Sequence, residues 1–216
     1  MPRGSHPDLI REYYSRAPFS EFNLWKFSRK HFRIEVSNHK FLKLNKTRTK
    51  LGIKDLRFLC MKYAPIHCYM SILDYLFPER VSSKMKTNAY PIGGEFVIDI
   101  DSYLYHKSHL HAPNNFSVCL ECLEISRRLT IQVCDEISRY YSKFGIVFSG
   151  RRGFHAHVFD FDVKDWTRFD VRDPLRSHAS ARFKFLKVIA PTTYCFDRHH
   201  FIVSVDPLRI ISVPMS

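Results

Sequence analysis

The stretch Glu95-Phe-Val-Ile-Asp99-Ile-Asp101 decides the fold that we expect for this chain. Its apolar residues predict a buried strand, and alternate residues of a strand point to the same face of a sheet. Asp99 and Asp101 therefore face one side, while Ile98 and Ile100 face the other. Two carboxylates so close together repel each other unless a cation lies between them. Because hard divalent ions take oxygen ligands, the pair is a candidate metal site for phosphoryl or nucleotidyl transfer, with a turn or a solvated strand end as the alternative.

The chain around this strand is strongly basic, with a formal net charge of +13 and a pI near 9.6. That balance favours a polyanionic partner, with nucleic acid or nucleotide first and an anionic membrane surface second; an ordinary basic surface is the alternative. The 45% hydrophobic content indicates a packed core and excludes a disordered chain. No stretch is long and apolar enough for a membrane span or a signal peptide, so we expect an intracellular protein of the cytoplasm and nucleoid, or of the nucleus, without a membrane partner.

Hydrophobic periodicity predicts the other elements. The 216 residues suffice for one large domain or two small ones, and Met1 to His6 resembles the remnant of a cleavable tag. We expect two short helices over 7–27 that meet at Pro18, a hairpin over 33–44, a helix over 53–63, a strand over 67–72, a helix from Glu121 to about Phe144, strands over 145–148 and 156–161, a helix over 182–189 and a strand over 201–205.

A second motif, Ser149-Gly-Arg-Arg-Gly-Phe-His155, lies between two of these strands. Its two glycines let the backbone approach an anion closely, and its two arginines are suited to grip phosphate oxygens. Ser149 can donate a hydrogen bond, and His155 begins the next strand and would point into the same cleft. A glycine hairpin with solvent-facing arginines is the alternative. The candidate phosphate-binding residues of this motif are Ser149, Gly150, Arg151, Arg152, Gly153 and His155.

A third carboxylate, Asp206, follows the strand expected near the end of the chain. On a neighbouring strand it would complete the oxygen shell for two divalent ions. The alternative is an ordinary aspartate at the end of a strand, before Pro207.

The order of these motifs resembles the archaeo-eukaryotic primase small (catalytic) subunit. The resemblance extends over nearly the whole chain and includes Leu9-Ile-Arg-Glu-Tyr-Tyr-Ser-Arg16, which is similar to that family's opening helix. It implies the primase fold, an α/β or α+β architecture with a central mixed or antiparallel sheet flanked by helices. We expect a single catalytic domain over 7–216.

The resemblance implies a role for each motif. Asp99, Asp101 and Asp206 would bind two Mg²⁺ or Mn²⁺ ions, and the motif from Ser149 to His155 would hold the triphosphate of the incoming nucleotide together with Arg209. The expected enzyme is a primase or primase-polymerase that makes short primers on single-stranded DNA from nucleoside triphosphates, by attack of a 3′-hydroxyl on an α-phosphorus. A repair or translesion polymerase of the same fold and a non-catalytic, basic, zinc-containing nucleic-acid-binding module are the alternatives.

The same family carries a structural zinc, here expected in a loop over 106–122. Cys119-x-x-Cys122 supplies one half of a tetrahedral site, and we expect His109 and His111, rather than His106, to supply the other. Core thiols at the two cysteines are the alternative.

The chain departs from the family between His155 and Asp206, where about fifty residues replace a larger helical subdomain. Ser212 also stands where the family has a basic residue. We therefore expect a minimal catalytic core, cut from a longer polypeptide, with a primase large subunit or a fused large-subunit-like region as partner.

Overall fold

The structure is a computed structural model that describes residues 7–17, 27–37, 40–44, 53–81, 86–101, 120–149, 153–189 and 204–213. These residues form two compact units. The first unit comprises Met1–Gly94 and Leu208–Ser216, and the second comprises Glu95–Pro207.

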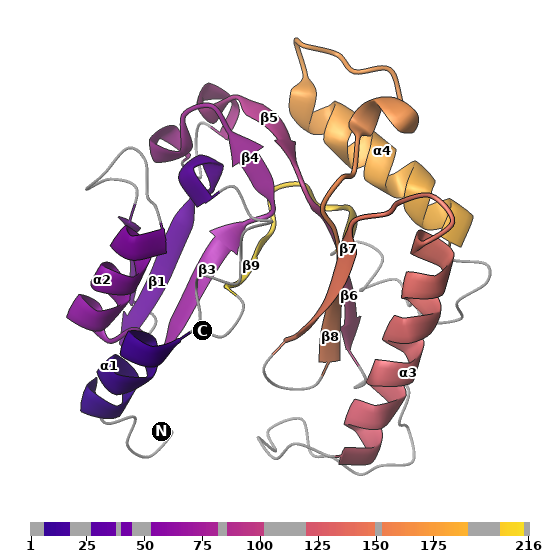
Figure 1. Cartoon of the computed structure of the whole chain (residues 1–216). Helices are drawn as coiled ribbons and strands as arrows, with labels where there is room; N and C mark the ends of the chain where they lie inside the picture. Colours follow the sequence, from indigo (N-terminus) through magenta and orange to yellow (C-terminus); the bar gives the residue numbers. More distant parts are fainter. Residues whose placement is uncertain are drawn as a thin grey trace. The chain divides into compact units, whose positions relative to one another are not determined.

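The first unit contains an antiparallel sheet of four strands with two helices on one side of it (Figure 1). The order of the strands is β2 (Lys40–Lys43), β1 (Phe32–Ser37), β3 (His67–Ser71) and β9 (Ile210–Ser212). The helices α1 (Pro7–Arg16) and α2 (Ile53–Tyr63) contact each other. The predicted hairpin over 33–44, the helix over 53–63 and the strand over 67–72 are confirmed.

Alternate residues of β1 and β3 form the hydrophobic core of the first unit. Phe32 and Ile34 of β1 and Met70 of β3 are fully buried. Cys68 shares their face of the sheet, opposite Ile34, and lies close to Tyr14 of α1. Burial, with the neighbouring thiols of Cys60 and Cys68, raises the pKa of Tyr14.

A second, two-stranded sheet completes the first unit, formed by β4 (Leu73–Tyr75) and β5 (Pro91–Gly94). Beside it Lys30 is buried, and its Nζ donates to the carbonyl oxygen of Ile72 at 2.8 Å and lies 3.2 Å from a carboxylate oxygen of Asp74. Gly94 has a φ of +137°, and a Cβ there would lie 2.5 Å from the Ile72 oxygen. The position therefore requires glycine.

The second unit packs two helices against one face of a three-stranded antiparallel sheet (Figure 1). The strand order is β6 (Phe96–Asp101), β8 (Gly153–Val158) and β7 (Phe144–Phe148), and the helices are α3 (Leu120–Ile137) and α4 (Pro174–Ile189). The hydroxyl of Ser126 in α3 donates to the carbonyl oxygen of Ile100 at 2.8 Å, which ties the helix to β6.

Short 3₁₀ helices lie in both units, at η2 (Phe27–Arg29), η4 (Pro78–Arg80), η5 (Lys86–Ala89) and η7 (Val163–Asp165).

Two helix boundaries differ from the prediction. The helix expected to run to about Phe144 ends at Ile137, where the amides of Ser138 and Tyr141 close the last turn. The helix expected from Arg182 begins eight residues earlier, at Pro174. Asp173 caps it, because its carboxylate accepts a hydrogen bond from the amide of Arg176 at 3.1 Å, and proline is favoured in the first helical turn.

Two strands also differ from the prediction. The strand expected over 156–161 runs over Gly153–Val158. The strand expected over 201–205 is wrong in its described part, because Ser204 and Val205 are helical. The last strand of the chain is β9, beyond Asp206, where Ile211 is buried in the first unit.

The predicted class is confirmed: antiparallel sheets flanked by helices, with the strands divided among three sheets. Among the helices of the described part, none has the length and apolar character needed to cross a bilayer. Of the two short helices expected over 7–27, the first is confirmed as α1. Residues 18–26, where the second is expected, lie outside the described residues.

The core of the second unit contains a buried histidine on α4. His178 is 2% exposed, and neither of its ring nitrogens has a hydrogen-bond partner among the described residues. Burial lowers its pKa to about 4; the charge of Arg182 adds to this effect, and Asp162 opposes it. The unfolded chain takes up a proton at this histidine near pH 6.5, whereas the folded protein does so only near pH 4. The stability contributed by neutral His178 is therefore complete above pH 6.5 and is lost as the pH falls towards 4.

We expect His178→Phe to reduce this acid sensitivity. Between pH 7.5 and 4.5 the wild-type protein should lose about 2.5 kcal/mol more free energy of unfolding than the variant, because the pKa of His178 is about 4 in the folded protein and 6.5 in the unfolded chain. Urea unfolding followed by tryptophan fluorescence at both pH values measures the difference. His31 in the first unit, whose pKa is also lowered to about 4, is present in both proteins and cancels. Equal pH dependence in the two proteins would contradict the prediction.

Candidate active site

The sheet of the second unit has one apolar face and one polar face. Phe96, Ile98 and Ile100 of β6 are buried against α3 and α4. Val97 and Asp99 of β6, together with Glu95 just before the strand, face the other way. On β8 the same alternation places Gly153, His155 and His157 on the polar face, because Asp99 is opposite His155 and Val97 is opposite His157. The register confirms the direction predicted for Asp99, whereas the shared face of Asp99 and Asp101 stays a prediction.

Asp99 forms a close contact with His155 across the two strands. The Nε2 atom of His155 lies 3.4 Å from a carboxylate oxygen of Asp99. The side chain of Asp99 is 22% exposed, and that of His155 is 8% exposed. A carboxylate held this way is ordered by its neighbour yet accessible to a ligand, which suits a hard cation. Asp101 continues β6 opposite Gly153, and its side chain lies outside the described part of the structure.

A second carboxylate–histidine pair lies further along the same face, and sequence reasoning missed it. Nδ1 of His157 is 2.6 Å from a carboxylate oxygen of Glu95, and both side chains are almost fully buried. The backbone oxygen of Glu95 also accepts a hydrogen bond from the buried Arg182 at 2.7 Å. The spacing of His155 and His157, two residues apart on a strand, was the signal that placed both on one face.

Ser149 closes the loop between β7 and β8. Its hydroxyl donates to the carbonyl oxygen of Gly153 at 2.9 Å, and it accepts from the amide of Gly153 at 3.2 Å. The amide of Ser149 donates to the same carbonyl at 2.9 Å. The two ends of the loop are therefore fastened together directly opposite Asp101. Gly150, Arg151 and Arg152, which form the tip of the loop, lie outside the described residues.

The segment that leads to Asp206 lies alongside β6. The amide of Asp99 donates to the hydroxyl of Ser204 at 3.3 Å. Asp206 is two residues further on, and two residues of extended chain span at most about 7 Å. The side chain of Asp206 is exposed. A helical turn, and not the predicted strand, precedes Asp206. That its carboxylate joins that of Asp99 stays a prediction.

Other predicted ligands are not brought together by the described residues. Arg209 belongs to the first unit, where its carbonyl oxygen accepts from the amide of Ile72. His106, His109, His111 and Cys119 lie outside the described residues, and Cys122, at the start of α3, is buried. Within the described ranges no group of three or more His, Cys, Asp or Glu side chains is placed to hold a metal ion. The zinc loop stays a prediction.

Curated proteins similar to this chain are DNA primase small subunits and a protein named for its likeness to them. The chain is 29% identical over 133 residues to DNA primase small subunit PriS of Methanocaldococcus jannaschii, covering 58% of this chain and 34% of that protein. It is 40% identical over 132 residues to an uncharacterized DNA primase small subunit-like protein of Archaeoglobus fulgidus, covering 58% and 41%. It is 30% identical over 114 residues to PriS of Pyrobaculum arsenaticum, covering 52% and 35%.

The match therefore spans less than half the length of these relatives. No family model matches the chain.

Proposed function

We propose that this chain, which is related in sequence to archaeo-eukaryotic DNA primase small subunits, is a template-directed nucleotidyltransferase that makes primers on single-stranded DNA. The observation that carries the proposal is the hydrogen bond from the amide of Asp99 to Ser204. It places the segment that leads to Asp206 beside the strand of Asp99 and Asp101, which lies over 100 residues earlier in the sequence.

Asp99, Asp101 and Asp206 are the proposed ligands of two Mg²⁺ or Mn²⁺ ions. Their oxygens are the donors that such hard ions prefer. The ions would neutralise charge that develops around the α-phosphorus during transfer. The contact with His155 at 3.4 Å supports this assignment, because it orients the Asp99 carboxylate before any ion binds.

The loop fastened by Ser149 is the proposed triphosphate site. Its tip contains Gly150, Arg151 and Arg152, and Gly153 and His155 follow on β8. Because Ser149 holds both ends of the loop, the tip starts directly beside the carboxylate strand. Arginine side chains bind phosphate oxygens in pairs, and glycine allows the backbone amides to approach them.

The partners and the zinc are parts of the same proposal. The expected substrates are a single-stranded template and nucleoside triphosphates, and a large subunit is the expected protein partner. A structural zinc bound by Cys119, Cys122, His109 and His111 would staple the loop before α3. The buried position of Cys122 fits either a zinc ligand or a core thiol.

A synthesis assay with and without a primer tests the function. The chain is incubated with a thymidine homopolymer, Mg²⁺ or Mn²⁺, and labelled ATP or dATP, and the products are separated by length. A primase is expected to form labelled oligonucleotides without a primer. Extension of an annealed primer alone would identify a repair or translesion type of polymerase. No incorporation under either condition would overturn the proposal.

A further inference from the structure

The four-stranded sheet of the first unit has a second face that carries aromatic and charged side chains. We name this set of six side chains the aromatic face: Arg33 and Glu35 of β1, Phe41 and Lys43 of β2, and His67 and Tyr69 of β3. They alternate with the buried residues that face α1 and α2, such as Ile34 and Met70. The core of the unit thus uses one side of these strands only.

The strand register arranges the six residues in two rows. In the first row Glu35 is opposite Phe41 on one side and opposite His67 on the other. In the second row Arg33 is opposite Lys43 and Tyr69. The ring of Tyr69 lies 6.1 Å from that of Phe41 and 5.8 Å from that of His67, measured between centroids. The three rings therefore form one continuous surface.

These rings remain accessible. Phe41 is 48% exposed, His67 is exposed and Tyr69 is half-buried. Phe41 lies on the edge strand β2, and its ring meets that of Tyr69 on the inner strand β3. An exposed apolar ring on the outer face of a sheet is informative, because that face is normally polar or covered by a second layer.

The charges beside the rings are predominantly basic. Arg33 and Lys43 lie directly opposite each other, and like charges in that position destabilise a sheet. Their positive charges help to lower the pKa of the neighbouring buried His31. The carboxylate of Glu35 is not presented to solvent, because Glu35 is only 8% exposed. Its Oε2 accepts a hydrogen bond from the hydroxyl of Tyr69 at 3.5 Å. Within the unit, Nε of Arg33 donates to Nε2 of His31 at 3.3 Å, and Nζ of Lys43 donates to the carbonyl oxygen of Val81 at 3.4 Å.

We propose that the aromatic face binds single-stranded nucleic acid, with bases stacked on Phe41 and Tyr69 and phosphates held by Arg33 and Lys43. Every base has a flat face, so stacking is tolerant of sequence, as a template surface requires. A four-stranded sheet with helices behind it and aromatic rings in front is also the arrangement by which RRM domains bind single strands. As the site of the template strand, the inference rests on the proposed function; as a binding surface it is independent of catalysis.

Charge is the reason to assign nucleic acid and not a protein partner to this face. The chain carries a net charge of +13, and three further basic residues follow Lys43 within seven positions of the sequence. A polyanion gains from such a positive charge, because each neutralised phosphate releases counterions.

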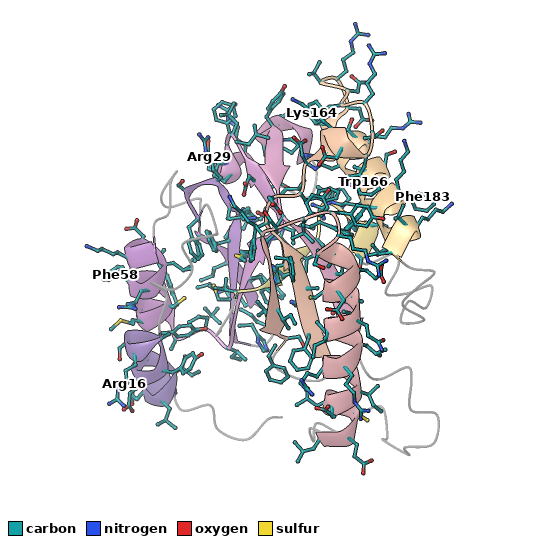
Figure 2. All side chains as sticks on the ribbon, turned by 45° about the vertical axis from the view of Figure 1, so that its right-hand side comes forward. Arg16, Arg29, Phe58, Lys164, Trp166 and Phe183 are labelled. Atoms are coloured by element: carbon teal, nitrogen blue, oxygen red, sulfur yellow. The ribbon has the colours of Figure 1, made fainter. Side chains whose placement is uncertain are left out.

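Binding of a roughly 12-nucleotide labelled strand, followed by fluorescence anisotropy, tests the inference without nucleotide or divalent ion. Phe41→Ala is expected to weaken binding roughly 5- to 100-fold, from the loss of one stacked base. Phe41→Tyr is expected to restore it. Phe58→Ala is the matched control, because Phe58 is 60% exposed on α2, the helix behind the sheet (Figure 2). It should bind as the wild type does.

The salt dependence of binding distinguishes the contribution of base stacking from that of phosphate contacts. Arg33→Gln is expected to reduce the slope of log affinity against log salt by about one, whereas Phe41→Ala leaves that slope unchanged. Arg16→Gln, on the exposed side of α1 (Figure 2), should change neither affinity nor slope. Oligothymidine and oligouridine arms distinguish DNA from RNA, and a duplex arm should show weaker binding and no effect of Phe41→Ala.

The inference is overturned if Phe41→Ala and Arg33→Gln bind like the wild type, or if the wild type binds no single strand at low salt. The test separates this failure from that of the proposed enzyme. If primer synthesis is absent but the Phe41 and Arg33 effects are found, the binding surface stands without the enzyme. If synthesis occurs and both variants bind normally, the template is held elsewhere.

Discussion

Asp99→Asn is expected to lower nucleotide incorporation by roughly 1,000-fold or more, while the affinity for single-stranded DNA stays the same or rises. The substitution keeps the volume and removes the charge that the proposed ions need, and these ions supply several kcal/mol of charge stabilisation in the transition state. Loss of one negative charge in a basic protein does not weaken the binding of a polyanion.

The measurement compares steady-state incorporation, anisotropy with labelled single strand, and circular dichroism. Asp135→Asn is the matched control, because Asp135 is an exposed aspartate on α3 of the same unit. It should retain full activity. Normal incorporation by a folded Asp99→Asn protein would contradict the proposed site and leave the non-catalytic nucleic-acid-binding module as the better description.

Phe185→Ala is expected to reduce the free energy of unfolding by about 3–5 kcal/mol, which is a large part of the 5–15 kcal/mol of a typical domain. Phe185 is fully buried at the centre of the second unit. Its ring lies 4.7 Å from that of Trp166, 5.3 Å from Tyr141 and 5.6 Å from Phe96, between centroids. Truncation would leave a cavity directly beneath the strand that carries Asp99.

Phe183→Ala, two residues away on α4, is the matched control (Figure 2). Phe183 is 40% exposed and contacts Lys187, so its truncation should change the stability by about 0.5 kcal/mol or less. Urea unfolding followed by tryptophan fluorescence measures both variants. A loss below about 1 kcal/mol for Phe185→Ala would show that the cluster of rings is not the core that holds the sheet and the helix together.

Local sequence patterns were sufficient to predict those features of the fold that depend on residues close together in the chain. The alternation of β6 placed Asp99 away from Ile98 and Ile100, and the structure has them on opposite faces. The helical periodicity of α2 located both of its ends, because Pro65 stops the helix and its apolar residues repeat regularly. Conversely, the start of α4 was missed although Asp173 and Pro174 form a cap and a first turn, since the polar residues after them obscure the periodicity.

The order and chemistry of the motifs by themselves determined that the chain resembles primase small subunits and that Asp99 points away from Ile98 and Ile100. Only the tertiary structure decided that Glu95 and His157 form a buried pair, that Ser204 contacts the backbone of Asp99, and that Phe41 and Tyr69 share a surface. Each of these contacts joins residues that are 28 to 105 positions apart. The physical reason is that periodicity reports which way a side chain points, whereas strand pairing across long connections decides which side chain it meets.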